Sequence, residues 1–375
     1  YNAQRKVTGL FAEALLPVGK SFEITPSLRH DRYDDFGSKT TYKLASRWQP
    51  AREWLLRGSV GTGFKAPTVP QVNAASQPFG VTGSTYSCNA NPALAQVAAN
   101  LGAICPAGGG AVQFDVIAAG NRQLKPENAK QWTLGFRFEP SDELTLGADL
   151  WSIRLDNTIG QISEDVVFGD PARFASSFTT FVDPSTGETL LAQFAGNVNL
   201  GKSETQGIDI DAQTRLKTAV GRWTSRFTAT YLIKDRFEVV PGDGFLSDLG
   251  QYNNGLVAFR WKARWTNTLE AGPWTHNLSF NYQSGYKDDP TSVLVRGTTD
   301  FETVSRKVAE YFTLDWQSRW QVNKQLALVA GANNLLNEDP PLSITLNGGG
   351  QMSGYDARYY DARGRTFYAR ANYRF

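Results

Sequence analysis

The last eleven residues, "RTFYARANYRF" at positions 365–375, decide how the whole chain is interpreted. Apolar or aromatic side chains occupy the odd positions from Phe367 to Phe375, and the even positions include Arg370 and Arg374. Alternation with a period of two residues is typical of a β-strand whose two faces meet different surroundings. The chain therefore ends on a strand with one apolar face and one charged face, and its last residue is aromatic.

The same alternation recurs along the chain and predicts further strands. In 257–266, for example, Trp261 and Trp265 alternate with Arg260, Lys262 and Arg264. The thirteen predicted strands are 5–16, 21–33, 40–49, 53–63, 130–139, 143–155, 203–216, 222–236, 256–270, 274–286, 309–320, 325–334 and 365–375.

The connections between these strands alternate between short and long. Tight turns such as "PVGK" at 17–20, "PAR" at 50–52 and "AGP" at 271–273 join strands at one end. The other end carries a short loop at 34–39 and then long loops at about 64–129, 156–202, 237–255, 287–308 and 335–364. Outer-membrane β-barrels sort their connections in this way, with short periplasmic turns and long outer loops.

Two further features favour a membrane barrel over a soluble β-sandwich, which also alternates. Several predicted strands exceed ten residues, whereas strands of soluble sheets usually have about 5–6. Tryptophans gather near the tight turns, as in the aromatic belt of a membrane interface; they are Trp48, Trp54, Trp223, Trp274 and Trp320. We therefore predict an all-β fold, a transmembrane antiparallel β-barrel with apolar side chains toward lipid and polar side chains toward the lumen.

The composition excludes several classes of protein. Among 375 residues, 38 Lys and Arg nearly balance 36 Asp and Glu, so no nucleic-acid partner is expected. The chain contains no run of about 18 apolar residues, which excludes a transmembrane helix.

Catalytic chemistry has few candidate residues. His30 and His276 are the two histidines, and neither has a Ser, Cys or second His at catalytic spacing. Strand parity points His276 toward lipid, beside Trp274. No Gly-rich phosphate loop is present. We expect no enzyme activity, no metal site and no cofactor.

The two cysteines, Cys88 and Cys105, lie in a loop rich in Gly, Ala and Asn. Their spacing suits one disulfide that closes this loop in an oxidising compartment. Two free thiols remain the alternative.

Four stretches resemble motifs of the TonB-dependent receptors of Gram-negative outer membranes. They are "GTGFKAPTVPQ" (61–71), "LKPENAKQWTLGFRFEP" (124–140), "ANNLLNEDPP" (332–341) and "RGRTFYARANYRF" (363–375). They occur in the order found in the family, although Leu336 stands where the family usually has Phe. The residues that carry the resemblance are Phe64, Pro67, Leu124, Pro126, Glu127, Asn334, Leu335 and Phe375.

The resemblance implies roles for these residues. Anchoring of loops at strand ends is the interpretation we favour for those in the first two motifs, with direct ligand contact as the alternative. Asn334 and Leu335 begin a loop and are expected to have a structural role there, since Asn side chains cap turns. Phe375 is expected to be read by the barrel-assembly machinery and to anchor the strand in outer-membrane lipid, the alternative being an ordinary strand end. The resemblance further implies a monomeric 22-stranded barrel, an N-terminal plug and a TonB energy-transducing partner.

Thirteen strands is an odd number, whereas barrels of this kind have an even number. We therefore expect 1–375 to be the C-terminal part of a receptor barrel that lacks the plug and the first strands. Such a part is not expected to transport by itself.

The expected function is TonB-dependent uptake of a scarce small-molecule nutrient across the outer membrane. A ferric siderophore is the ligand that the resemblance favours; a vitamin, an oligosaccharide or a peptide remains an alternative within the family, and a passive porin is an alternative of another class. Aromatic side chains of the long loops are the candidate ligand contacts: Phe79, Tyr86, Tyr252, Tyr286, Tyr355, Tyr359 and Tyr360.

Overall fold

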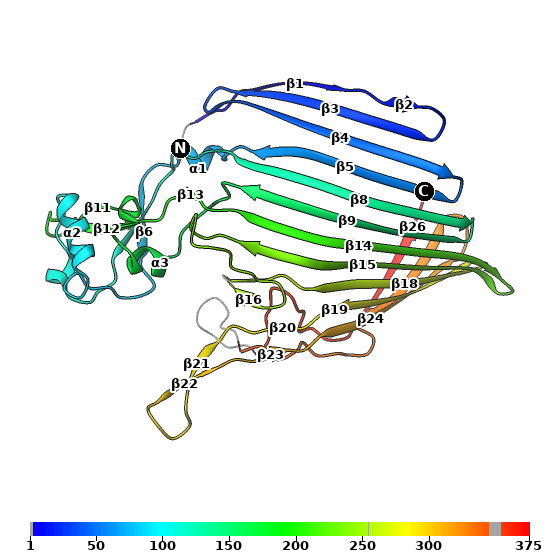
Figure 1. The fold of residues 1–375 in the computed structure, drawn as a ribbon. Helices are drawn as coiled ribbons and strands as arrows, with labels where there is room; N and C mark the ends of the chain where they lie inside the picture. The colour runs from blue at the N-terminus through cyan, green and yellow to red at the C-terminus, as the bar shows by residue number, and fades with distance from the viewer. Residues whose placement is uncertain (1–2, 254, 345–353) are drawn as a thin grey trace.

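A computed structural model describes residues 3–253, 255–344 and 354–375. One antiparallel sheet of fourteen strands dominates it (Figure 1). Short β2 (Leu16–Val18) pairs with β3, and the other strands are neighbours in chain order. These are β1 (Val7–Glu13), β3 (Phe22–Tyr33), β4 (Gly37–Ala51), β5 (Trp54–Lys65), β8 (Glu127–Ser141), β9 (Leu144–Asp156), β14 (Ser203–Thr218), β15 (Gly221–Phe237), β18 (Trp261–Ala271), β19 (Trp274–Gln283), β24 (Tyr311–Gln321), β25 (Leu326–Asn333) and β26 (Thr366–Tyr373).

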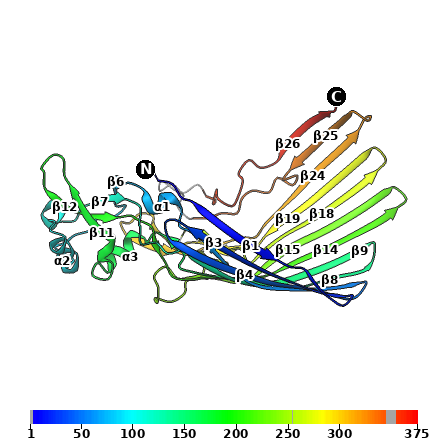
Figure 2. The same ribbon diagram turned by 90° about the horizontal axis from the view of Figure 1, so that it is seen from above.

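The sheet curves into an open trough (Figure 2). Within the part of the chain that the structure describes, β1 and β26 are the two edges of the sheet and are not paired with each other. Large apolar side chains are exposed on the strands, among them Leu134 at 61%, Phe367 at 71% and Trp48 at 45%. In a soluble protein such a surface would be buried, but in a membrane it faces lipid.

Each of the thirteen predicted strands corresponds to one strand of the main sheet, so the predicted fold class is confirmed. Several predicted ranges were too long, among them 5–16, where β1 ends at Glu13, and 365–375, where β26 ends at Tyr373. Two errors fall at the loop end of the sheet. The prediction 256–270 should begin at Trp261, and 274–286 should end at Gln283. Val257 and Tyr286 continue the apolar alternation, but they are buried in a cluster of loop side chains rather than facing lipid. A period of two residues does not distinguish these environments.

The tight-turn end of the sheet carries the predicted tryptophans. Trp54 and Trp274 are the first residues of β5 and β19, and Trp320 lies one residue before the end of β24. His276 lies on the same outward face as Trp274, and their rings stack with centroids 5.7 Å apart.

At the opposite end, the first two long loops fold together into one lobe, drawn beside the sheet in Figure 1. Its central sheet has the order β11-β12-β7-β6, in which β12 and β7 pair in parallel although they come from different loops. The lobe's elements are α1 (Val69–Asn73), β6 (Gln77–Val81), α2 (Pro92–Asn100), η1 (Pro106–Gly109), β7 (Asp115–Ala118), β10 (Ile159–Gly160), α3 (Glu164–Gly169), η2 (Ala175–Ser177), β11 (Phe178–Val182), β12 (Thr189–Phe194) and β13 (Val198–Asn199).

The later loops form short hairpins. Their strands are β16 (Tyr252–Asn253), β17 (Leu256–Val257), β20 (Tyr286–Lys287), β21 (Thr291–Leu294), β22 (Phe301–Val304) and β23 (Lys307–Val308). The hairpin β21–β22 projects away from the main sheet (Figure 1). None of the described helices is both long and apolar enough to cross a membrane.

Candidate functional site

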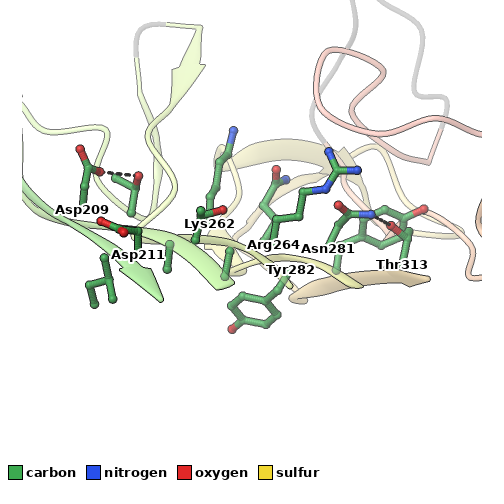
Figure 3. A pocket seen from close by; sticks show the side chains of 14 residues that line it. Asp209, Asp211, Lys262, Arg264, Asn281, Tyr282 and Thr313 are labelled. Atoms are coloured by element: carbon green, nitrogen blue, oxygen red, sulfur yellow. Dashed lines mark hydrogen bonds between the residues drawn. The ribbon is translucent and has the colours of Figure 1, made fainter. Parts of the chain in front are cut away.

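The concave face of the sheet contains a pocket of about 620 Å³ formed by β14, β15, β18, β19 and β24. Asp209, Lys262 and Arg264 point into it, whereas Tyr282 points to the opposite side of the sheet (Figure 3). This separation follows from the alternation of side chains along a strand. The antiparallel register then brings the polar residues of neighbouring strands side by side, as in the pair Arg264 and Asn281.

Hydrogen bonds hold part of this pocket in place. The Thr230 hydroxyl donates to Asp209 Oδ1 at 2.7 Å, and Asn281 Nδ2 donates to Asp315 Oδ2 at 2.9 Å. The two cations are less constrained: among the described residues, neither Lys262 nor Arg264 has a carboxylate oxygen within 4.0 Å. Lys262 lies 4.7 Å from the ring centroid of Phe259, and Arg264 donates to Ser279 Oγ at 3.4 Å. The pocket therefore holds two cations without an ion-pair partner in this part of the structure, beside the carboxylates of Asp209 and Asp211.

Charged side chains also pair on β5 and β9, elsewhere on the same inner wall. Arg57 Nε donates to Asp149 Oδ1 at 2.7 Å, across β8, which lies between them. Gly135 lies on β8 beside this pair, and a Cβ there would overlap the Asp149 carboxylate. Gly147 leaves room for the Asp211 carboxylate in the same manner. The inner wall is thus a charged surface whose glycines let side chains reach across strands.

The lobe at the mouth has its own hydrophobic core, which includes Leu94, Phe114 and Leu191. The predicted disulfide between Cys88 and Cys105 is confirmed, with their Cα atoms 6.3 Å apart. Because the bridge joins the two ends of the segment that contains α2, it constrains that segment against the core.

Tyr86 is part of the same lobe core. Its ring stacks on Phe168 with centroids 3.7 Å apart, and its hydroxyl donates to Asp165 Oδ1 at 3.0 Å. Burial, together with this hydrogen bond and the charge of Glu164, raises the pKa of Tyr86 well above its ordinary value. The side chain therefore remains a neutral donor that joins α3 to the loop before α2.

A second pocket of about 440 Å³ lies in the lobe. Phe79 and Phe194 line it, and Phe79 is 71% exposed. Glu164 also lines this pocket, where its carboxylate accepts the backbone N–H groups of Gly83 and Ser84 at 2.9 and 2.8 Å. The sequence carries no signal for Phe194, because it reaches the pocket of Phe79 only through the pairing of β6 with β7 and of β7 with β12.

The other five predicted ligand aromatics gather in a different cluster, under the later loops. Tyr286 is 1% exposed and Tyr360 is 5% exposed. The Tyr359 hydroxyl accepts the N–H of Val257 at 2.9 Å, and the Arg358 guanidinium lies 5.2 Å from the ring centroid of Tyr252. Tyr355 packs against the same cluster. Burial raises the pKa of Tyr360 to about 12. As placed, Tyr286 and Tyr360 pack the loops together and have little surface for a ligand.

The first two family motifs join the lobe to the sheet. The Phe64 ring meets Tyr33 edge-on with centroids 5.8 Å apart, and the Pro67 carbonyl accepts the Arg5 guanidinium at 2.5 Å. Leu124 and Pro126 are buried where the chain enters β8.

Glu127 links three segments of the chain at the same place. Its Oε1 accepts the N–H of Ile159 at 2.7 Å, and its Oε2 lies 3.2 Å from Lys65 Nζ. One carboxylate thus connects the end of β5, the start of β8 and the loop after β9.

The third motif forms a tight turn after β25. Asn334 has a positive φ of 50°, and its side chain exchanges two hydrogen bonds with the backbone of Glu338, at 2.8 and 2.9 Å. The Leu335 N–H donates to the Leu314 carbonyl at 2.6 Å. Asparagine tolerates this backbone region better than most residues.

Phe375 lies beyond the end of β26, fully exposed, and its ring meets Tyr373 edge-on with centroids 5.2 Å apart. Its expected role in assembly and lipid anchoring stays a prediction. Within residues 3–253, 255–344 and 354–375, no cluster of three or more His, Cys, Asp or Glu side chains suits a metal ion.

The chain was compared with known proteins. A family model described as "TonB dependent receptor-like, beta-barrel" matches residues 1–335. The vitamin B12 transporter BtuB of Vibrio vulnificus (strain CMCP6) is 33% identical over 64 residues, which are 17% of this chain and 10% of that protein.

Solved structures share the fold at low sequence identity. The siderophore receptor PirA of Acinetobacter baumannii is 17% identical with a TM-score of 0.66, over 99% of this chain and 46% of that one. A mutant of the ferric enterobactin receptor PfeA of Pseudomonas aeruginosa, in complex with enterobactin, gives a TM-score of 0.67 and 17% identity over 98% of this chain and 45% of that one. The chain thus spans less than half the length of these receptors. Together with the family match over most of its length, the sheet identifies the chain as a member of the TonB-dependent receptor-like β-barrel family.

Proposed function

We propose that the chain forms part of the wall of an outer-membrane receptor of a Gram-negative bacterium, which takes up a small-molecule nutrient with energy supplied through TonB. The observation that carries this proposal is the inverted sheet: exposed apolar side chains cover the outward face, while charged side chains such as Asp209 and Lys262 occupy the concave face. Family membership supports the same function. Because outer-membrane barrels have short periplasmic turns, we place the tight turns in the periplasm and the lobe outside the cell.

The strands of the main sheet supply only part of the barrel in this proposal. The unpaired edges at β1 and β26 among the described residues, and the coverage of less than half of the solved receptors, are consistent with a larger closed barrel. Its plug, its remaining strands and its TonB-binding segment lie outside 1–375. Transport therefore requires the complete receptor.

A ferric siderophore is the ligand we favour. The solved neighbours include siderophore receptors. Lys262 and Arg264, which form no ion pair with any described residue, suit a ligand with negative charge. The 64-residue match to a vitamin B12 transporter makes a corrinoid the second candidate.

Phe79 is the residue we assign to first contact with the ligand, because it combines large exposure with a position on the lobe pocket. An exposed aromatic ring can stack on the planar groups of a chelating ligand. Tyr252, Tyr355 and Tyr359 stay secondary candidates, since each is half-buried against the loop cluster.

The test uses the complete receptor in cells that lack their own copy. Uptake of iron from a panel of ferric siderophores, and of cobalamin, is measured with TonB present and absent. We expect TonB-dependent uptake of iron from one siderophore class. Uptake of cobalamin alone would replace the siderophore by the corrinoid, and uptake of small solutes regardless of TonB would favour a passive porin.

Phe79→Ala then tests the contact. We expect the ligand Kd to rise about tenfold, which corresponds to about 1.4 kcal/mol. Phe301→Ala is the matched control, because Phe301 is 70% exposed on the separate hairpin β21–β22. Equal Kd values for the two variants would remove Phe79 from the site.

A further inference from the structure

The outward face of β24, β25 and β26 has a hollow that the uptake function does not use. Across the strands, Ser318 pairs with Ala330, and Ala330 pairs with Ala369. These three side chains therefore lie in one row, and Ala371 follows in the next row beside Leu328. Small side chains in adjacent positions leave space that neighbouring large side chains enclose. The space has a volume of about 650 Å³ and is here called the aromatic hollow.

Aromatic rings form the walls of the aromatic hollow. The rings of Trp274 and Trp320 stack with centroids 5.4 Å apart and an interplanar angle of 8°. The His276 ring also stacks on Trp274, with an interplanar angle of 5°. Trp316 lines the hollow as well. This part of the wall is preformed, because the rings of Trp320 and His276 both stack on Trp274.

His276 and Ser318 satisfy one pair of polar atoms in the aromatic hollow. His276 Nδ1 and the Ser318 hydroxyl are 2.7 Å apart, within hydrogen-bond distance. The backbone groups of β24 and β25 are committed, since each of these strands pairs on both sides; the outer edge of β26, unpaired among the described residues, pairs with a further strand in the closed barrel proposed above. An occupant with backbone amides of its own would then find no partners here, and unsatisfied amides are costly in lipid. An apolar chain has no such requirement.

The aromatic hollow lies at the tight-turn end of the sheet. Trp274 follows the turn after β18, and Trp320 lies just before the turn that joins β24 to β25. That second turn carries Lys324, which is exposed. Tryptophan and lysine side chains are favoured at the level of lipid headgroups, where lysine attracts phosphate. The hollow is thus continuous with the lipid-facing belt and has a positive charge at its headgroup end.

We propose that the aromatic hollow binds one acyl chain of a phospholipid from the periplasmic leaflet, with the phosphate of that lipid near Lys324. The inference rests on the membrane placement given under the proposed function, which assigns the tight turns to the periplasmic side. A bilayer lipid of that leaflet supplies both an apolar chain and an anionic phosphate at the required depth. The bound lipid would also cover the surface next to the exposed Tyr373 and Phe375.

The test counts phospholipids that remain on the purified complete receptor after exchange into mild detergent, using native mass spectrometry with phosphatidylglycerol as the added probe. We expect one retained lipid on the unmodified receptor. Ala330→Phe fills the middle of the hollow from the outward face and should lower retention about tenfold. Ala148→Phe is the matched control, because Ala148 pairs with Ile210 on a distant part of the same outward face, and it should retain the lipid.

Folding is checked separately by the heat-dependent shift of barrel proteins in gel electrophoresis, and Ala369→Phe provides a second filling variant. Equal retention by the unmodified receptor and a folded filling variant would overturn the proposal. The proposal would also be overturned if the mass showed two copies of the receptor and no lipid, and if the Ala330→Phe variant showed a single copy. Failure of nutrient uptake leaves this result unaffected, because lipid retention is measured without any ligand.

Discussion

Removal of the disulfide should loosen the lobe without unfolding the barrel. The bridge joins residues 17 positions apart. Closure of a loop of that length removes entropy from the unfolded segment and so raises its free energy by about 3 kcal/mol. Cys88 is 4% exposed within the lobe core, so Cys88→Ala combined with Cys105→Ala replaces it without adding a polar group. Since each 1.4 kcal/mol is a tenfold change, the opening constant of the lobe should rise by about two orders of magnitude.

Hydrogen exchange of backbone amides measures this opening residue by residue. We expect faster exchange in α2, whose side chains pack in the lobe core, and in β7, which follows the core residue Phe114 and is itself buried at Val116 and Ile117. The amides of β14 and β15 are the internal control, because these strands pair with each other and with further strands of the main sheet. Their exchange should not change.

Equal exchange rates in α2 and β7 with and without the bridge would refute a role of the disulfide in closing the lobe. That result would mean that the hydrophobic core alone holds the segment closed. Faster exchange throughout β14 and β15 would contradict the independence of lobe and sheet.

Two other changes test the charged parts of the protein. Gly135→Ala should displace the Asp149 carboxylate and break its ion pair on the inner wall, because the new Cβ would overlap it. Thermal unfolding should show that the free energy of unfolding falls by about 1 kcal/mol. Gly63→Ala is the control and should lower it less, because the Cβ there would meet only the Cβ of Ala129 at 3.6 Å. In the lobe, burial and then the charge of Asp183 raise the pKa of Asp115. A carboxyl whose pKa is raised on folding stabilises the lobe below its unfolded pKa of about 4, and this contribution is lost as the pH rises through the folded value. The protection factors of the β7 amides, which are corrected for the intrinsic effect of pH on exchange, should therefore be larger in acid than at neutral pH, and Asp115→Asn should remove the difference.

The sequence by itself determined the strands of the main sheet and the face of each strand. Period-two alternation indicates which face of a strand each side chain occupies, and turn length indicates which end of the sheet a connection lies at. Trp261, Lys262 and Trp265 can therefore be assigned to faces from the sequence. The disulfide also followed from spacing and local composition. These are local properties, which the chain encodes within a few residues.

The tertiary structure alone decided what the long loops do. Phe79 and Phe194 lie 115 positions apart, and only the pairing of β6 with β7 and of β7 with β12 brings them to one pocket. In the sequence, Tyr286 and Tyr360 are aromatic loop residues just as an exposed ligand contact would be. In the structure they are buried in one cluster between two loops. Side chains of loops have no fixed period, so their exposure depends on which distant segments pack against them. For the same reason the aromatic hollow could not be foreseen, because it arises from the register that aligns Ser318, Ala330 and Ala369 across three strands.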